Sequence, residues 1–222
     1  MLGYHFVGVT LKNGEPVPPD GQWLVHAGRI EPCVSGLHMS ERPFQALQYA
    51  PGSTICRVEL DGDLASHGDP IDKWVGRRRR IIGRADATEM LRRFAADQAL
   101  AVAHMWDMPT VVRDYLVTLD ALMLVAAGDA ASAASAAART ATGVAAGDAA
   151  SHAADAARTA TWAAAWAATR NAADAARAST RAATWAAAEP VRNAAAIAAW
   201  AAAWAAAGIE FDLRATKLFT KG

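Results

Sequence analysis

The chain has 222 residues and a formal net charge of zero, because 22 acidic residues balance its 22 basic ones. That balance argues against a general nucleic-acid coat protein, which needs a net basic surface to neutralise phosphates. The length is enough for one or two domains with a hydrophobic core.

The N-terminus lacks a basic region followed by an apolar run, so we expect no signal peptide. The first half of the chain then alternates strand-forming residues with turn signals. This pattern predicts strands, some of them short, at residues 2–11, 23–27, 37–40, 54–60 and 74–82. The strand at 54–60 has the clearest alternation of apolar and polar side chains.

Helix signals lie between and after these strands. Ser40 is expected to cap a helix over residues 42–49, with Pro43 in its first turn. The run Asp86–Glu89 is similar to a capping box and predicts a helix that reaches about His104.

Pro109 is expected to open a further helix, because apolar residues follow it at helical spacing. These residues are Val112, Tyr115, Leu116, Leu119, Leu122 and Met123. The elements together predict an α+β fold with a small mixed or antiparallel sheet, divided into a head domain at 1–84 and connecting helices at 85–125. Cys33 and Cys56 lack metal-site spacing, so we expect buried thiols of a cytosolic protein.

Residues 126–207 are mostly alanine, which has the highest helix propensity. Polar residues interrupt this tract every few positions, whereas a membrane span needs about 20 nearly uninterrupted apolar residues. The segment 127–132 recurs at 146–151, and Asp155–Arg158 recurs at Asp174–Arg177, an offset of nineteen residues in both cases (127 to 146, 155 to 174). The tract therefore predicts alanine-rich helical repeats, followed by a C-terminal segment at 208–222.

The length of the repeat favours several short helices over one rod. At about 100° per residue, an offset of this length would turn the repeated residues away from one face of a straight helix. Gly128 and Gly147 suit positions just past helix ends, Asp129 and Asp148 suit N-caps, and Pro190 is expected to end or kink the helix before it. A solenoid of short strands is the structural alternative, although alanine is a poor strand former.

Alanine buries little apolar area per residue, so the tract should depend on larger side chains or on a partner. The tryptophans are spaced to form ridges on the helices, and they are candidates for self-association or for contact with a host protein: Trp162, Trp166, Trp185, Trp200 and Trp204.

The run Gly36-Leu37-His38-Met39-Ser40, the following Pro43 and Tyr49, and a strand that ends at Asp61-Gly62 resemble an uncharacterised domain recurrent in bacteriophage and prophage genomes. The resemblance covers about residues 4–82. It implies a phage-borne accessory protein that acts in the bacterial cytoplasm, and it implies no known activity.

The same region is more weakly similar to ADP-ribosyltransferase-type domains. That similarity implies that His5, on the first strand, binds the ribose of NAD, and that His38 stands where the family has a nicotinamide-stacking aromatic residue. A later glutamate would polarise the ribose, and Glu59 and Glu89 are the candidates in this sequence.

The candidate ligand-binding residues are therefore His5, His38 and Tyr49, together with Arg77 and Arg79 of the run Arg77–Arg80. Alternate arginines of a strand point to opposite faces, so the run is either a charged, solvated edge strand or an anion site. Histidines on a strand or beside a helix start are commonly packed structural residues. The sequence shows no phosphate loop, no Cys/His metal cluster and no Ser-His-Asp set, and it leaves any cofactor open.

These observations favour a non-enzymatic accessory or interaction protein. Two alternatives remain open: an enzyme or binding protein that uses NAD or another nucleotide, and a module that sequesters a small anion or nucleotide through the arginines of 77–84.

Overall fold

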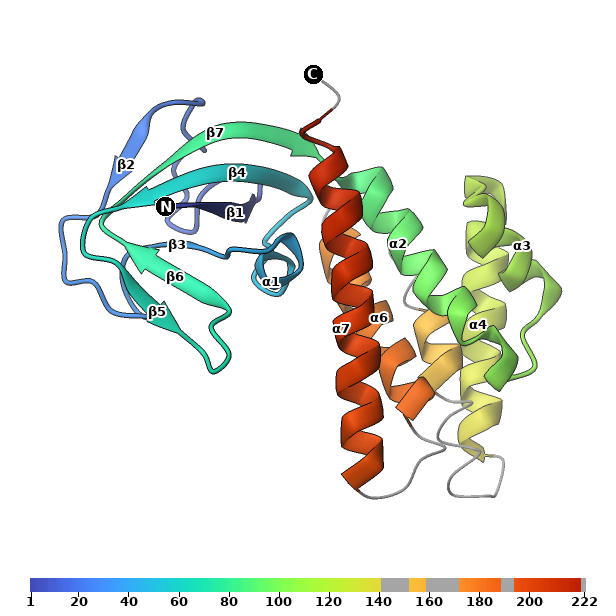
Figure 1. The fold of residues 1–222 in the computed structure, drawn as a ribbon. Coiled ribbons are helices and arrows are strands. Elements are labelled where there is room, and N and C mark those ends of the chain that lie inside the picture. Colours follow the sequence, from blue (N-terminus) through green and yellow to red (C-terminus); the bar gives the residue numbers. More distant parts are fainter. Residues whose placement is uncertain (141–151, 159–171, 189–193, 221–222) are drawn as a thin grey trace. The chain divides into compact units, whose positions relative to one another are not determined.

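The computed structural model describes residues 1–140, 152–158, 172–188 and 194–220 (Figure 1). The chain forms two compact units. The head unit comprises Met1–Thr88 and Ile209–Gly222, and the helical unit comprises Glu89–Gly208. Antiparallel strands in the first unit and helices in the second confirm the predicted α+β class for the described residues.

Two antiparallel sheets form the head unit. The larger sheet has the strand order β1-β4-β7-β2, with β1 at Leu2–Val7, β4 at Thr54–Asp61, β7 at Arg78–Asp86 and β2 at Trp23–Val25. The smaller sheet has the order β3-β6-β5, with β3 at Leu37–Met39, β6 at Lys73–Gly76 and β5 at Ala65–His67. A backbone bridge joins β1 to the end of β3, because Tyr4 N donates to Ser40 O (2.7 Å) and Ser40 N donates to Tyr4 O (2.9 Å).

The single strand predicted at 74–82 is wrong, because the chain changes sheets at Arg77. There Arg77 N donates to Gly62 O (2.7 Å) and Arg77 O accepts from His26 N (2.8 Å), so its backbone pairs with neither β3 nor β4. Gly76 allows the close approach at this corner, since a Cβ there would lie 2.9 Å from Leu60 Cγ. The first strand is also shorter than predicted and ends at Val7.

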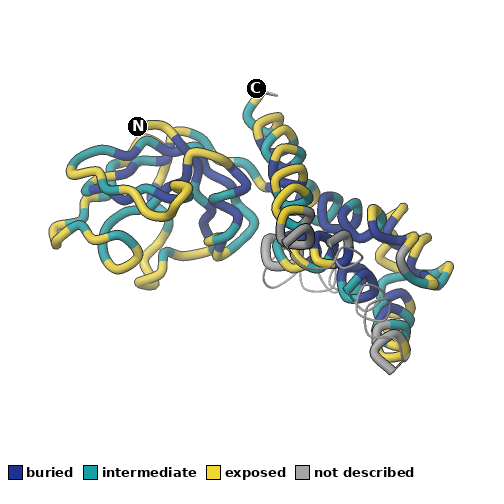
Figure 2. Tube along the Cα trace, turned by 60° about the horizontal axis from the view of Figure 1, so that its bottom comes forward, coloured by how far each residue is buried: buried dark blue, intermediate teal, exposed yellow. Residues whose placement is uncertain are grey.

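Alternation along the strands separates two faces of the larger sheet. One face buries an inner cluster of apolar side chains: Val7, Met39, Cys56, Val58, Leu60 and Ile81. The opposite face buries Phe6 and Ile55, and helix α1 (Pro43–Leu47) packs against β1. In Figure 2 the strands of the head carry the buried residues, and its loops are mostly exposed.

The prediction that Ser40 caps the first helix is wrong. Helix α1 has Arg42 as its N-cap, and the Gln45 side chain accepts a hydrogen bond from Arg42 N (3.2 Å). The backbone of Ser40 is instead occupied by its bridge to β1, two residues too early for a cap. Pro43 does occupy the first turn, as predicted.

The C-terminal segment completes the head unit. From Ile209 onward, helix α7 (Ala194–Lys217) belongs to that unit. Phe211 is fully buried, and its ring centroid lies 5.7 Å from that of Phe44. Asp212 accepts from Arg42 Nε (2.6 Å) and from Phe44 N (2.7 Å), so a residue far along the chain fixes the start of α1.

The helical unit combines the connecting helices with the alanine-rich ones. Its helices are α2 (Thr88–Ala101), α3 (Thr110–Thr118), α4 (Leu124–Thr140), a helical segment at 152–158, α6 (Ala172–Ala188) and the first part of α7. Alanines from α2, α4, α6 and 152–158 form most of its core, and Val112, Tyr115 and Leu116 of α3 are among its larger members.

The helix after Pro109 is shorter than predicted. Leu119 has a left-handed backbone (φ 57°) and ends α3, so Leu122 is exposed instead of continuing the buried stripe. Arg93 of α2 stabilises this end, because its guanidinium donates to the carbonyl oxygens of Leu116 and Val117.

The helix boundary predicted at Gly128 and Asp129 is wrong, because α4 runs through both residues. The aspartate that caps a helix start lies earlier in the chain, at Asp120, whose carboxylate accepts a hydrogen bond from Leu122 N (2.9 Å). Once started, an alanine-rich helix tolerates one internal glycine at a cost of about 1 kcal/mol. Gly147, Asp148, Trp162 and Trp166 lie outside the described residues.

Pro190 also lies outside the described residues, so its predicted effect on the preceding helix stays a prediction; α6 is described up to Ala188 and α7 from Ala194. The alternative of a strand solenoid is wrong for the described part of the tract, which is helical. Among the helices that the structure describes, none combines the length and the hydropathy needed to cross a bilayer.

Candidate ligand-binding site

Of the five arginines at residues 77–84, all except Arg79 form ion pairs with carboxylates in the described part of the chain. Arg77 pairs with Asp63 (2.6 Å), Arg80 pairs with Glu59 (2.6 Å), and Arg78 pairs with Asp61. Arg84 donates from Nε to Asp20 (2.7 Å). These four are partly exposed ion pairs, which neutralise most of the positive charge of the run.

Arg79 differs from its four neighbours. It is only 5% exposed, and it lies on the same face of β7 as Ile81 of the inner cluster. Its guanidinium donates to the carbonyl oxygen of His38, and among the described residues no carboxylate forms an ion pair with it. Burial lowers the pKa of Arg79 to about 10, so the side chain stays charged at neutral pH.

His5 belongs to the same inner face. It lies on β1 two residues before Val7 and directly opposite Cys56 of β4. Burial is the main cause that lowers the pKa of His5 well below 6.5, and the charge of Arg79 adds to it, so the imidazole is neutral at pH 7. Burial also raises the pKa of Cys56 to about 11, which keeps its thiol protonated. We call His5, Cys56 and Arg79 the inner polar group.

His38 and Tyr49 gather on the other side of β3. Pairing of His38 with Val75 places the His38 side chain on the same face of the small sheet as Lys73, opposite to Met39. Lys73 is buried, and its Nζ lies 4.2 Å from the centroid of the Tyr49 ring. Burial, together with the hydrogen bond that the Tyr49 hydroxyl donates to Asp72, raises the pKa of Tyr49. We call His38, Tyr49, Asp72 and Lys73 the outer polar group.

The His38 imidazole is also held neutral. Burial, followed by the charges of Lys73 and Arg79, lowers its pKa from 6.5 to about 4. Its Nε2 atom is buried and has no hydrogen-bond partner among the residues that the structure describes. The two histidines lie within electrostatic reach of each other, because His38 contributes to the lowered pKa of His5.

The sequence-based candidates therefore do not all meet on one face. Arg79 acts electrostatically on His5 from the same inner face, and Lys73 lies near both His38 and Tyr49, with strand β3 between the two groups. Arg77 belongs to neither group. Besides its ion pair with Asp63, its guanidinium donates to His26 O (3.1 Å) and Gly28 O (3.2 Å). Lys73 was not among the candidate ligand-binding residues, because its place near the arginine run marked it only as part of a basic stretch.

The two cysteines have different environments. Both are free thiols, and Cys56 is buried as predicted. Cys33 is exposed, so that prediction is wrong; it lies in a turn with a left-handed backbone (φ 66°). Among the described residues, no three His, Cys, Asp or Glu side chains lie close enough to hold a metal ion.

The helical unit exposes aromatic and small apolar side chains. Trp185 of α6 is 45% exposed, and its ring lies 5.8 Å from that of Trp200, which stacks on Trp204 at 5.7 Å. Residues 194–208 of α7 contain no charged side chain. Among the residues of this stretch whose burial the structure describes, five are exposed alanines: Ala198, Ala201, Ala202, Ala205 and Ala206.

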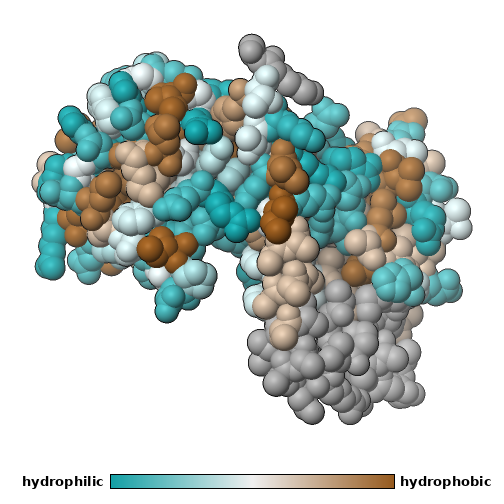
Figure 3. Space-filling model, in the orientation of Figure 1, coloured by the Kyte–Doolittle hydropathy of each residue, from teal (hydrophilic) through white to brown (hydrophobic). Residues whose placement is uncertain are grey.

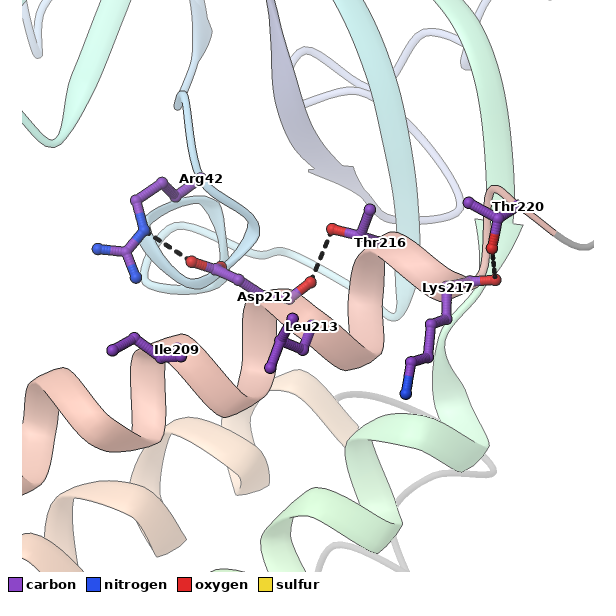
Figure 4. A pocket seen from close by; sticks show the side chains of 7 residues that line it. All are labelled: Arg42, Ile209, Asp212, Leu213, Thr216, Lys217 and Thr220. Carbon is purple, nitrogen blue, oxygen red and sulfur yellow. Dashed lines mark hydrogen bonds and ion pairs between the residues drawn. The ribbon is translucent and has the colours of Figure 1, made fainter.

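The head unit has a separate surface hollow with a volume of about 370 Å³ (Figure 4). Ile209 and Leu213 contribute its apolar wall, and Arg42 and Lys217 lie at its rim. Figure 3 shows apolar surface along α7, where Ile209 and Leu213 are exposed. The hollow is shallow, and its charged member Arg42 is already paired with Asp212.

Comparison with known protein families gives one match, which covers the first part of the chain. Residues 1–93 match the model of a family described as a domain of unknown function (DUF7666). The match covers the first stretch of the head unit and the start of α2, and it ends before the alanine-rich tract. No curated protein and no solved structure matches the chain.

Proposed function

We propose that this protein is a non-enzymatic interaction module, and that its alanine-rich helical unit associates with a second copy of the chain. The observation that carries the proposal is the fifteen-residue stretch of α7 at 194–208, which has no charged side chain and exposes alanines. A helix that is apolar on all sides is typically buried.

A second copy suits this face because the face carries no charge and is built of small side chains. Such a surface is self-complementary, so a two-fold axis can place the same alanines against each other at close backbone distance. The area per alanine is small, and Trp185 is the large exposed side chain near it. We therefore expect a weak, concentration-dependent dimer.

The test is sedimentation or light scattering of the whole protein and of the variant Ala202→Glu/Ala206→Glu. The unchanged protein should form dimers, and the variant should be monomeric because two carboxylates per copy would be buried against each other. The matched control is Ala133→Glu, at an exposed position of α4, which should still form dimers. A monomeric unchanged protein at about 100 µM, well above the micromolar range of weak complexes, or a dimeric double variant would refute the proposal.

Point variants are sharper than truncation in this chain. A protein that ends at Val125 would also lose Phe211 and Asp212, which belong to the head unit. Its aggregation or unfolding would then say nothing about association through α7.

The wider biological setting is part of the same proposal. The phage-domain resemblance of residues 4–82 supports an accessory role in a bacterial cytoplasm, and the nineteen-residue recurrence supports repeated helices in the tract. The use of NAD stays a prediction, tested by nicotinamide release that is lost on His5→Ala.

A further inference from the structure

Arg79 has a chemical environment that the proposed association does not use. It is the buried arginine of a five-membered set whose other members, Arg77, Arg78, Arg80 and Arg84, all pair with carboxylates. We propose that Arg79 and His5 bind a small tetrahedral oxyanion, a phosphate or the phosphoryl group of a small ester, inside the head unit.

The first step of the argument is the cost of the buried charge. An ionised side chain loses several kcal/mol of hydration when it leaves water, and proteins normally offset this loss with a counter-charge. Carboxylates are abundant around this strand, since Asp61 and Glu59 flank it, yet they pair with Arg78 and Arg80. A bound anion would supply Arg79 with the opposite charge that the described residues do not.

The second step is the donor capacity around Arg79. A guanidinium has five N–H donors in a planar fork, and within the described part of the chain Arg79 makes one hydrogen bond, to His38 O. The other members of the inner polar group are a neutral imidazole, which has one N–H donor, and a protonated thiol. Neither brings negative charge, so the group as a whole favours an acceptor ligand.

The third step is the class of ligand. Arginine forms two parallel hydrogen bonds to phosphate or carboxylate, and both are stronger than hydrogen bonds between neutral groups. The buried Lys73 adds a second positive charge nearby, on the other side of β3, and both cations act on the His38 ring. Positive charges on both sides of β3 favour a dianion over a monoanion such as a carboxylate.

A purely structural Arg79 is the competing explanation. Its hydrogen bond to His38 O ties β7 to β3, and a tie of this kind needs no ligand. The two explanations differ in one measurable respect, because only the binding role makes the protein respond to phosphate.

The experiment is calorimetric titration of the full-length protein with inorganic phosphate, methyl phosphate and acetate, at constant ionic strength. Saturable binding of phosphate or of its methyl ester is expected, and binding of either one supports the proposal. In Arg79→Gln the affinity should fall about 10-fold or more, as expected for loss of a charged hydrogen-bond donor. The affinity of Arg79→Lys should lie between those of the unchanged protein and of Arg79→Gln, because lysine keeps the positive charge but lacks the planar set of donors.

The matched control is Arg80→Gln, one residue along the same strand, where the arginine pairs with Glu59. It should bind phosphate as the unchanged protein does. The proposal is refuted if the unchanged protein binds neither phosphate probe, if acetate binds as tightly, or if Arg79→Gln keeps full affinity.

A second measurement covers the case in which Arg79→Gln does not fold. In the unchanged protein, the Arg79 Nε–H resonance should shift during the phosphate titration, in step with the imidazole resonances of His5. Shifts confined to Arg77, Arg78, Arg80 or Arg84 would locate phosphate on the surface and refute the proposal.

Discussion

The two units of the protein bury polar side chains in different ways. In the helical unit the buried polar residues include hydroxyls, and each finds a backbone carbonyl: Ser179 donates to Ala95 O (2.7 Å), Thr180 to Ala176 O (2.6 Å) and Thr184 to Arg181 O (2.9 Å). In the head unit the buried polar residues include the cations Arg79 and Lys73. A hydroxyl on a helix is satisfied locally, whereas a cation in a sheet interior needs a counter-charge from elsewhere.

The two units also differ in what fills their cores. The head buries large side chains such as Phe6, Met39 and Phe211, whereas the helical unit packs mainly alanines. A core of large residues should be sensitive to deletion of atoms, and a core of alanines to their addition. The buried cations therefore mark a candidate binding site in the head unit, whereas the buried hydroxyls of the helical unit contribute to helix packing.

The largest effect should come from Phe211→Ala. Phe211 is fully buried against Phe44, so the variant leaves a cavity and should lower the unfolding free energy of the head unit by about 3–5 kcal/mol. Hydrogen exchange of the β1 and β4 amides, with denaturant titration, measures it. Ile209→Ala, exposed on the same helix, should change it by less than about 0.5 kcal/mol. Equal effects would show that the C-terminal segment does not complete the head core.

A smaller effect is expected where atoms are added to the alanine core. Ala156 is fully buried among alanines of the helical unit, so Ala156→Leu should cost about 1–3 kcal/mol of stability. Ala133→Leu, at an exposed position of α4, is the control and should be nearly neutral. Amide exchange in α2 and α6 reports on this unit. If Ala156→Leu stabilises the protein instead, the alanine core contains unfilled space and the contrast between the units is weaker.

Local patterns in the sequence predicted part of this architecture. Alternation correctly put Arg78 and Arg80 on one face, since both guanidinium groups lie over the Trp23 ring, at 5.0 and 4.8 Å. It also identified the strand at 54–60 and the first-turn role of Pro43. These features depend on neighbours close in the sequence, which a periodic pattern records.

Features that depend on residues distant in the chain could not be predicted from local sequence patterns. The sheet change at Arg77 needs Gly62 and His26, and the place of Phe211 in the head needs Phe44. At the candidate site, His5 and Arg79 were identified by residue type, but the burial of Arg79 follows from packing of β3 over β7. No local pattern separates one arginine of four in a row.

Acidification should test the charged interior of the head. The pKa of His38 is about 4 in the folded state and 6.5 as its ordinary value, so between these pH values the unfolded chain binds more protons. The contribution of His38 to the unfolding free energy should be fully present above pH 6.5. It should be lost as the pH drops towards 4, a decrease of about 1–2 kcal/mol after allowance for the partly exposed ring. His38→Gln should flatten this acid limb in pH-dependent thermal unfolding. An unchanged slope would mean that neither burial nor the nearby cations lower the pKa of this ring in the folded state.

The smallest effect should come from the hydroxyls of the helical unit. Ser179 is fully buried and reaches from α6 to the carbonyl oxygen of Ala95 on α2, so Ser179→Ala should cost about 1 kcal/mol. Thr216→Ala is the matched control, because the exposed Thr216 hydroxyl donates to Asp212 O (2.7 Å) within its own helix. Loss of that bond should be nearly neutral, since water replaces it. If Ser179→Ala is also neutral in denaturant unfolding, the hydroxyl does not join the two helices, and alanine packing alone holds α6 against α2.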